Sequence, residues 1–452
     1  MQVPRPGVIV RDVAAEGLQS SIVLTLVDLR GYDGDPTRAL PRPVLDRDAA
    51  RASVADVVAA VRERGDEAVR EATTRYGGSA AEPRAVDTAA IAAAVDGCEP
   101  GLLAGLRSAA ERIRGYHEYQ LSEERAAWWR IGGESVRVGE ETRPLRRVGC
   151  YVPGGRAAYP SSVLMTAIPA LVAGVDEVCV CVPGAPDGSG VHQATLAAMG
   201  VAGVDEAYEC GGAQAIAALA YGTETIQRVD KIVGPGSIWV ALAKHEVALD
   251  VGVDSFAGPT EVAIVADETA PPSFVAADLV AQAEHDPLAT ALLFTPSQKL
   301  VDDVEEALAK ELANADRRED IEAALRGQGR AVLVDDIDRA RRFADAFAPE
   351  HLELICAGAE EHLTRIRNAG AVFVGSYSPV ALGDYVAGTN HVLPTFGSAR
   401  FASPLRVSDF IRSTAVVEFD REGLEHVAGS LGSIARAEGL TAHARAIEVR
   451  LT

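Results

Sequence analysis

The chain has 452 residues, of which 48% are apolar and 5% aromatic, and its formal net charge at pH 7 is −22. At roughly 100–200 residues per domain this length predicts two to four domains with sizeable cores, and the many small apolar residues favour packed α/β layers over a β-sandwich. The negative charge argues against nucleic acid or anionic lipid as a partner, because both would be repelled.

The N-terminal region carries no targeting signal that we recognise. Residues 1–22 lack the apolar core of a signal peptide, and no stretch approaches the roughly 20 apolar residues that span a bilayer. We therefore expect a cytoplasmic protein in which residues 1–22 form a loose extension and residues 23–46 form an arm that begins with a strand over Val23–Leu29. The six cysteines match no common zinc spacing, and we expect them to be buried, reduced thiols.

From Arg47 to about His117 the pattern is helical. Val54, Val57 and Val61 recur at helical spacing with charged residues between them, which indicates amphipathic helices. Three or four such helices are expected here.

A first α/β unit begins near Arg147, where short apolar runs alternate with helical stretches. The expected strands are Val148–Val152, Val178–Val182, Asp205–Glu209 and Lys231–Val233. The expected helices between them are Ser162–Ala173, Val191–Met199 and Ala213–Tyr221. Glycine or proline follows each strand, at the carboxyl edge where open α/β sheets bind ligands. No G-x-G-x-x-G fingerprint follows the first strand, so the glycines alone are weak evidence for a dinucleotide.

A second α/β unit follows the first, and the chain is expected to become helical again from Pro404. Its expected strands are Val262–Ala266, Ala289–Phe294, Ala331–Val334, Leu352–Cys356 and Ala371–Val374, and its helices are Pro272–Gln282, Gln298–Asn314 and Ile337–Phe347. Two further helices, Leu424–Ala437 and Ala442–Val449, are predicted at the end. The fold class is therefore α/β, with two parallel-sheet units and helical segments at both ends.

Four groups of polar residues stand out from residue 282 onward, and each has an ordinary structural explanation when taken alone. Gln282 and His285 lie three apart at a helix end, where they can contribute metal ligands or simply cap a helix. Glu350 and His351 are adjacent bases before a strand, or part of an ordinary loop. The two remaining groups are Asp384 with His391 in a glycine-rich turn, and Glu438 with His443 at the start of the last helix.

Taken in order, several stretches of the chain resemble the histidinol dehydrogenase family, from about Leu24 to the C-terminus. These stretches are Tyr151–Met165, Gly211–Thr223, Val229–Gly236, Ala257–Glu261, Gln282–Asp286, Pro349–Leu352 and Gly383–Thr395. The combination is far more specific than any one of them.

The resemblance implies an NAD-dependent oxidation of L-histidinol to L-histidine, with His351 as general base and Glu350 activating water. It implies one zinc ion per subunit, which holds the substrate, on four ligands: Gln282, His285, Asp384 and His443. The implied substrate contacts are these four residues together with Thr260, His351, His391 and Glu438. The implied NAD contacts are Tyr151, Gln214 and Ser237.

The resemblance also implies an intertwined homodimer in which Glu438 and His443 serve the partner's site. The two α/β units would be incomplete Rossmann-like folds. Residues 47–150 would join 260–404 as the main domain, with 151–259 inserted and 405–452 forming a helical tail that reaches the partner.

Two positions depart from the family pattern. Ser237 stands where Asn is usual, which puts one NAD contact in doubt, and Thr260 replaces Ser but keeps the hydroxyl. Two rival functions stay open: a related zinc- and NAD-dependent enzyme acting on another alcohol such as a sulfonated diol, and a zinc hydrolase without NAD. A metal-binding protein without catalysis would leave the adjacent bases unexplained.

Overall fold

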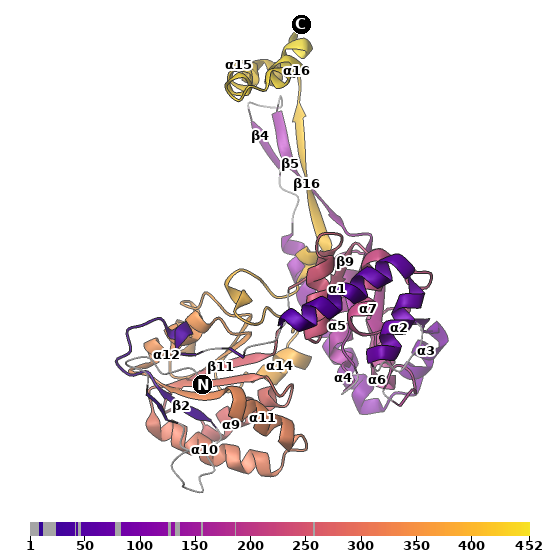
Figure 1. Cartoon of the computed structure of the whole chain (residues 1–452). Helices are drawn as coiled ribbons and strands as arrows, with labels where there is room; N and C mark the ends of the chain where they lie inside the picture. Colours follow the sequence, from indigo (N-terminus) through magenta and orange to yellow (C-terminus); the bar gives the residue numbers. More distant parts are fainter. Residues whose placement is uncertain are drawn as a thin grey trace.

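A computed structural model describes residues 9–11, 24–40, 42–43, 47–76, 83–124, 128–131, 136–154, 157–185, 187–255 and 258–452. The chain forms two lobes, each built on a largely parallel sheet, and a long stalk that carries the last two helices away from both lobes (Figure 1). The prediction of a mixed α/β fold with parallel sheets is confirmed. Most of the expected extension, and Val23, lie outside the described residues.

The first lobe contains a six-stranded sheet in the order β10-β9-β6-β7-β8-β3. In that order the strands are Gly252–Val253, Lys231–Val233, Arg147–Tyr151, Glu177–Val182, Glu206–Glu209 and Arg84–Ala85. All neighbours pair in parallel except β3, which is antiparallel to β8. The central strands β6 and β7 are buried along nearly their whole length because helices cover both faces.

Eight helices pack around this sheet. They are α1 (Arg47–Arg64), α2 (Asp66–Tyr76), α3 (Thr88–Asp96), α4 (Pro100–Glu123), α5 (Pro160–Val172), α6 (Gln193–Ala202), α7 (Gly212–Tyr221) and α8 (Ile238–Val247). Helix α1 lies against α7 and α8, while α3 lies against α6 and α4 against α5. The apolar stripe of Val54, Val58 and Val61 joins the same core as Ile216. These helices bury their apolar faces against the first sheet, whereas the resemblance grouped residues 47–150 with 260–404 as one domain.

The second lobe contains a seven-stranded sheet in the order β1-β2-β13-β12-β11-β14-β15. In that order the strands are Ile9–Arg11, Thr25–Asp28, Gly329–Leu333, Thr290–Thr295, Glu261–Ala266, His351–Ile355 and Ala371–Val374. Only β1 is antiparallel to its neighbour. The strand β1 lies within residues 1–22, which were expected to form a loose extension, and it is an edge strand beside β2. The α-helices of this lobe are α9 (Pro272–Ala283), α10 (Gln298–Ala313), α11 (Arg318–Gln328), α12 (Ile337–Phe347), α13 (Ala359–Leu363) and α14 (Val380–Tyr385).

The stalk is a three-stranded antiparallel sheet, β16-β5-β4, of Ile411–Phe419, Val136–Pro144 and Trp128–Ile131. The helices α15 (Arg421–Ala437) and α16 (Thr441–Leu451) sit at its far end (Figure 1). The expectation of helix directly after Pro404 is wrong for β16, whose β-branched Thr414, Val416 and Val417 favour an extended chain. No single helix in the described part of the chain is long and apolar enough to cross a bilayer; α3 and α4 pass only as a pair bent by 113°.

The cysteines are all free, as expected. Four are buried, whereas Cys98 and Cys356 are only half-buried, so the expectation of full burial is wrong for these two.

Candidate active site

The predicted acid/base pair lies at the amino edge of the second sheet. Thr260 directly precedes β11 and Glu350 directly precedes β14, and these neighbouring parallel strands place Val262 opposite His351. Gln282 and Asp384 lie in the last turns of α9 and α14, because a helix that follows a strand in a parallel unit runs back toward the strand's amino end. The site thus forms at the opposite edge from the one where open α/β sheets usually bind ligands.

Three of the four predicted zinc ligands lie together. Gln282 is 2% exposed, and its Nε2 donates to Thr260 Oγ1 at 2.6 Å. Its Oε1 is buried and receives no hydrogen bond within the described residues. Just beyond the end of α9, His285 places its Nε2 3.8 Å from Asp384 Oδ2. An amide oxygen, an imidazole and a carboxylate are ligands that suit a borderline cation such as zinc.

The fourth predicted ligand lies elsewhere in this chain. His443 is exposed on α16, and Glu438 is exposed at the end of α15, both at the tip of the stalk (Figure 1). No cluster of three or more His, Cys, Asp or Glu side chains in the described ranges is placed to hold a metal ion. One copy of the chain therefore brings together only three of the four predicted ligands, one of them an amide.

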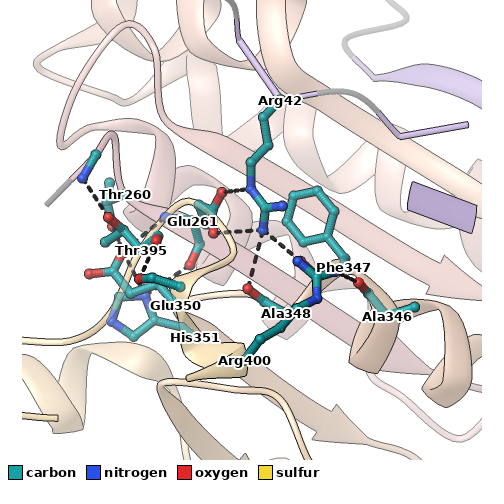
Figure 2. Close-up of polar contacts among 12 residues, drawn as sticks. Arg42, Thr260, Glu261, Ala346, Phe347, Ala348, Glu350, His351, Thr395 and Arg400 are labelled. Atoms are coloured by element: carbon teal, nitrogen blue, oxygen red, sulfur yellow. Dashed lines mark hydrogen bonds and ion pairs between the residues drawn. The ribbon is translucent and has the colours of Figure 1, made fainter. Parts of the chain in front are cut away.

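Glu350 is held by two donors on one oxygen. Its Oε2 accepts from Thr260 Oγ1 at 2.6 Å and from the Glu261 backbone N–H at 2.9 Å (Figure 2). Burial raises the pKa of Glu350 to about 8 in spite of these hydrogen bonds, and the negative charges of Glu261 and Asp384 act in the same direction. A carboxyl group with a pKa near neutrality can both accept and return a proton at physiological pH.

The imidazole of His351 has a fixed tautomer. Its Nδ1 lies 3.0 Å from the carbonyl oxygen of Glu261, and since a carbonyl only accepts, Nδ1 must carry the proton. The lone pair is then on Nε2. Burial lowers the pKa of His351, which keeps the ring neutral and makes Nε2 a base.

His391 connects the two lobes. Its Nδ1 lies 3.0 Å from the backbone oxygen of Asp384, and its Nε2 lies 3.3 Å from Ser162 Oγ at the start of α5. Beside it, Asn390 Nδ2 donates to the backbone oxygen of Met165 at 2.6 Å. The carboxyl edge of the first sheet, where α5 begins, thus faces the amino edge of the second.

The predicted NAD contacts lie at that carboxyl edge, but two of them are occupied by the chain itself. Tyr151 is buried and its hydroxyl accepts from the Gly212 N–H at 3.1 Å; Gln214 is buried and donates to Thr73 at 3.3 Å. Ser237 is exposed at the start of α8 and makes no side-chain cap. Gly155, in the glycine pair after β6, lies outside the described residues.

Comparison with known proteins decides the family. A family model described as histidinol dehydrogenase matches residues 40–451. The chain belongs to the histidinol dehydrogenase family. A histidinol dehydrogenase from Methanothermobacter thermautotrophicus is 46% identical over 410 residues, which are 91% of this chain and 95% of that protein. One from Leifsonia xyli is 46% identical over 431 residues, 94% of this chain and 98% of that protein.

The fold agrees with a solved member of the family. The crystal structure of a histidinol dehydrogenase from Elizabethkingia anophelis is 32% identical and matches with a TM-score of 0.89, over 95% of this chain and 98% of that one. As a histidinol dehydrogenase family member, the chain is an oxidoreductase that acts on a CH–OH group.

Sequence reasoning missed Ser162 and Glu261, which contact predicted site residues of this histidinol dehydrogenase fold, and Arg42, which contacts Glu261. Glu261 holds both Glu350 and His351 through its backbone. A charged residue at the start of the apolar run Glu261–Ala266 is the one signal in the sequence that marks a buried charge in need of a partner. Nothing in the sequence names Arg42 as that partner.

Proposed function

We propose that this chain oxidises L-histidinol to L-histidine through L-histidinaldehyde, in two successive hydride transfers to NAD, as a cytoplasmic homodimer with one zinc ion per subunit. The observation that carries the proposal is the orphaned, buried Oε1 of Gln282, which lies in the same hydrogen-bonded group as Thr260 and Glu350. A buried acceptor without a donor is costly unless a ligand uses it.

The zinc ion would be held by Gln282, His285 and Asp384 of one copy and by His443 of a second copy. It would supply a Lewis acid that helps to hold the substrate. Thr260 supports this arrangement because its hydroxyl accepts from Gln282 and donates to Glu350, which ties the ligand group to the base. His391 and Glu438 would complete the substrate contacts.

The proton transfers follow from the two bases. In the first oxidation His351 Nε2 takes the hydroxyl proton while the carbinol hydride leaves to NAD, which yields the aldehyde. As the aldehyde is hydrated, Glu350 accepts a proton from the attacking water and the protonated His351 returns its proton to the carbonyl oxygen. Glu350 then passes its proton to solvent. His351 then takes a proton from the resulting diol as the second hydride leaves to a second NAD, which yields the carboxylic acid. The raised pKa of Glu350 and the neutral ring of His351 support these roles.

The first sheet supports dinucleotide binding. The order β8-β7-β6-β9 places its parallel strands as third, second, first and fourth, which creates a switch point between β6 and β9. Three helices, α5, α7 and α8, begin at this edge without a cap from the N-cap side chain, which favours binding of a pyrophosphate to their first turns. In α7 the N–H of Gly212 is already taken by the Tyr151 hydroxyl. At the switch point, Gly234 (φ +116°) lets the chain after β9 pack closely against the end of β6, because an added Cβ would clash with the Tyr151 carbonyl. Ser237 would contact NAD directly, beside the buried Tyr151 and Gln214.

The tail helices support the homodimer. An apolar groove of about 750 Å³ lies between α15 and α16, and both Glu438 and His443 are among the residues that line it. Ile434 in the same groove is 61% exposed. A second copy that covers this surface would bury the groove and bring His443 to the three other ligands.

An assay of NADH formation with L-histidinol tests the proposal, with two NADH expected per histidine formed. Glu350→Gln should chiefly slow the step from aldehyde to acid, whereas His351→Asn should slow both steps by roughly 10²–10⁴-fold. Turnover of a sulfonated diol but not of L-histidinol would reject the substrate. Hydrolysis of an ester analogue without NADH formation would reject the reaction type.

A further inference from the structure

Arg42, from the arm before α1, forms an ion pair with Glu261 inside the second lobe. Its Nε donates to Glu261 Oε1, and its Nη2 lies 3.2 Å from Oε2, so the contact is bidentate (Figure 2). Glu261 is 1% exposed, and burial raises its pKa while the Arg42 guanidinium opposes this. A carboxylate buried this deeply depends on a cationic partner, and Arg42 is that partner here.

The backbone of Glu261 forms hydrogen bonds with both proposed bases. Its backbone N–H donates to Glu350 and its backbone oxygen accepts from His351 Nδ1. A shift of the first residue of β11 would therefore move the carboxyl group and the imidazole together.

Arg42 also holds the turn that leads into the acid/base pair. Its Nη2 donates to the backbone oxygens of Phe347 at 2.6 Å and Ala348 at 3.2 Å, and its guanidinium lies 3.8 Å from the centre of the Phe347 ring. Ala348 adopts a left-handed conformation (φ +55°) two residues before Glu350. The donated hydrogen bonds compensate for that unfavourable backbone.

A second left-handed residue contacts the same ion pair. Phe396 (φ +58°) donates its backbone N–H to the Glu261 carboxylate. In the part of the chain that the structure describes, Ala348 and Phe396 are the two non-glycine residues with positive φ. Strained backbone persists where surrounding contacts fix it, and here the Arg42–Glu261 pair contributes a contact to each of the two residues.

We propose that Arg42 is a positioning residue for Glu350 and His351 and that it acts through Glu261. This inference rests on the proposed function of the two bases. Arg42 contacts no residue of the zinc-ligand group in the described structure, so its removal should disturb the chemistry more than substrate binding.

The test is Arg42→Ala, assayed with L-histidinol and NAD. We expect kcat to fall by about 10²-fold, as for a base displaced by about 1 Å, while KM for L-histidinol changes by less than about threefold. Millimolar guanidinium chloride, compared with the same concentration of sodium chloride, should restore kcat about tenfold. In the double variant Arg42→Ala/Glu261→Gln, the loss should be no larger than in Arg42→Ala alone, because the unpaired buried charge is gone.

Arg400→Gln is the matched control. Arg400 also donates from Nη2 to the end of α12, at the Ala346 oxygen, but forms no hydrogen bond or ion pair with Glu261 among the described residues (Figure 2). The kcat of the Arg400→Gln variant should stay within about threefold of the wild-type value. Arg42→Lys covers the case in which Arg42→Ala fails to fold: it keeps the charge but not the fork, and kcat should fall about tenfold.

Wild-type kcat in Arg42→Lys or in a folded Arg42→Ala would overturn the inference. Equal losses in Arg42→Ala and Arg400→Gln, or a loss unaffected by guanidinium, would also overturn it. A wild-type protein that forms no NADH from L-histidinol would instead reject the proposed function, which keeps the two failures apart.

Discussion

The hydroxyl oxygen of Ser162 lies 3.3 Å from Nε2 of His391, across the boundary between the two lobes. Because His391 Nδ1 faces a backbone carbonyl, that nitrogen carries the proton and Nε2 accepts from the serine. Burial lowers the pKa of His391, in keeping with a neutral ring. This contact joins the start of α5 to the loop that follows α14 and carries His391.

Ser162→Ala should weaken that junction. The lost hydrogen bond is worth about 1 kcal/mol, so we expect kcat/KM for L-histidinol to fall about fivefold, with little change in the melting temperature. Steady-state kinetics at saturating NAD measures the effect. The neighbouring substitution Ser161→Ala serves as control, and equal kinetics for the two variants would contradict a role for the contact.

Gln282→Leu should weaken zinc binding, because leucine fills a similar volume without the orphaned oxygen. We expect at least tenfold weaker zinc affinity in a chelator competition, with the metal-free protein still folded by circular dichroism. Gln298→Leu changes an exposed glutamine of α10 whose side chain donates to Asp302 at 2.9 Å, and it should leave the affinity unchanged. Unaltered zinc affinity in Gln282→Leu would remove this residue from the ligand set.

The stability of the metal-free protein should depend on pH through Glu350. Its pKa is raised from 4.5 to about 8, so the fold favours the protonated form. Its destabilising contribution is absent below about pH 4 and complete above about pH 8, so stability falls as pH rises through this window. At roughly 1.4 kcal/mol per pKa unit, Glu350→Gln should be several kcal/mol more stable than wild type at pH 9 and nearly equal at pH 4.

Urea unfolding at several pH values measures this difference. Glu360→Gln, which changes an exposed glutamate of α13, should show no such trend. A stability difference between Glu350→Gln and wild type that stays constant with pH would mean that Glu350 does not carry the raised pKa.

Mixed dimers should reveal a shared site. A His443→Ala subunit lacks a ligand that it would give to its partner, and a Glu350→Gln subunit lacks a base in its own lobe. In a heterodimer of the two, one site keeps both groups, so mixing two weakly active variants should recover up to half of the wild-type activity per mixed dimer. Recovery that never exceeds the sum of the separate variants would argue that each chain builds its site alone.

The strands and helices around the two sheets could be predicted from the sequence because their burial imposes a continuous apolar pattern. The predicted strand Val178–Val182 differs from β7 by one residue, and the helix Ile337–Phe347 matches α12. The grouping of α1–α4 could not be predicted, since an amphipathic helix shows that it packs but not against which sheet. Strand β16 was missed because its exposed residues give no alternation of burial.

The candidate site divides in the same way. Gln282, His285, Glu350, His351 and Asp384 stood out as polar groups in the sequence and received their roles through the resemblance. The structure brings them to one edge of one sheet. Arg42 could not be named, because its partner Glu261 lies 219 positions away and a lone arginine in an arm has no periodic signature. The sequence also could not predict that the site lies at the amino ends of the strands, because this follows from where α9 and α14 end in space.

The stalk has a consequence for the order of assembly. Within the described residues, the four hydrophobic cores include nothing beyond Ile411, so both lobes complete their packing without α15 and α16. A newly made chain can thus reach a folded state while its tail still has no counterpart. Pairing of two such chains would then be a separate, concentration-dependent event. At low protein concentration, activity would therefore fall more steeply than the concentration of folded chain.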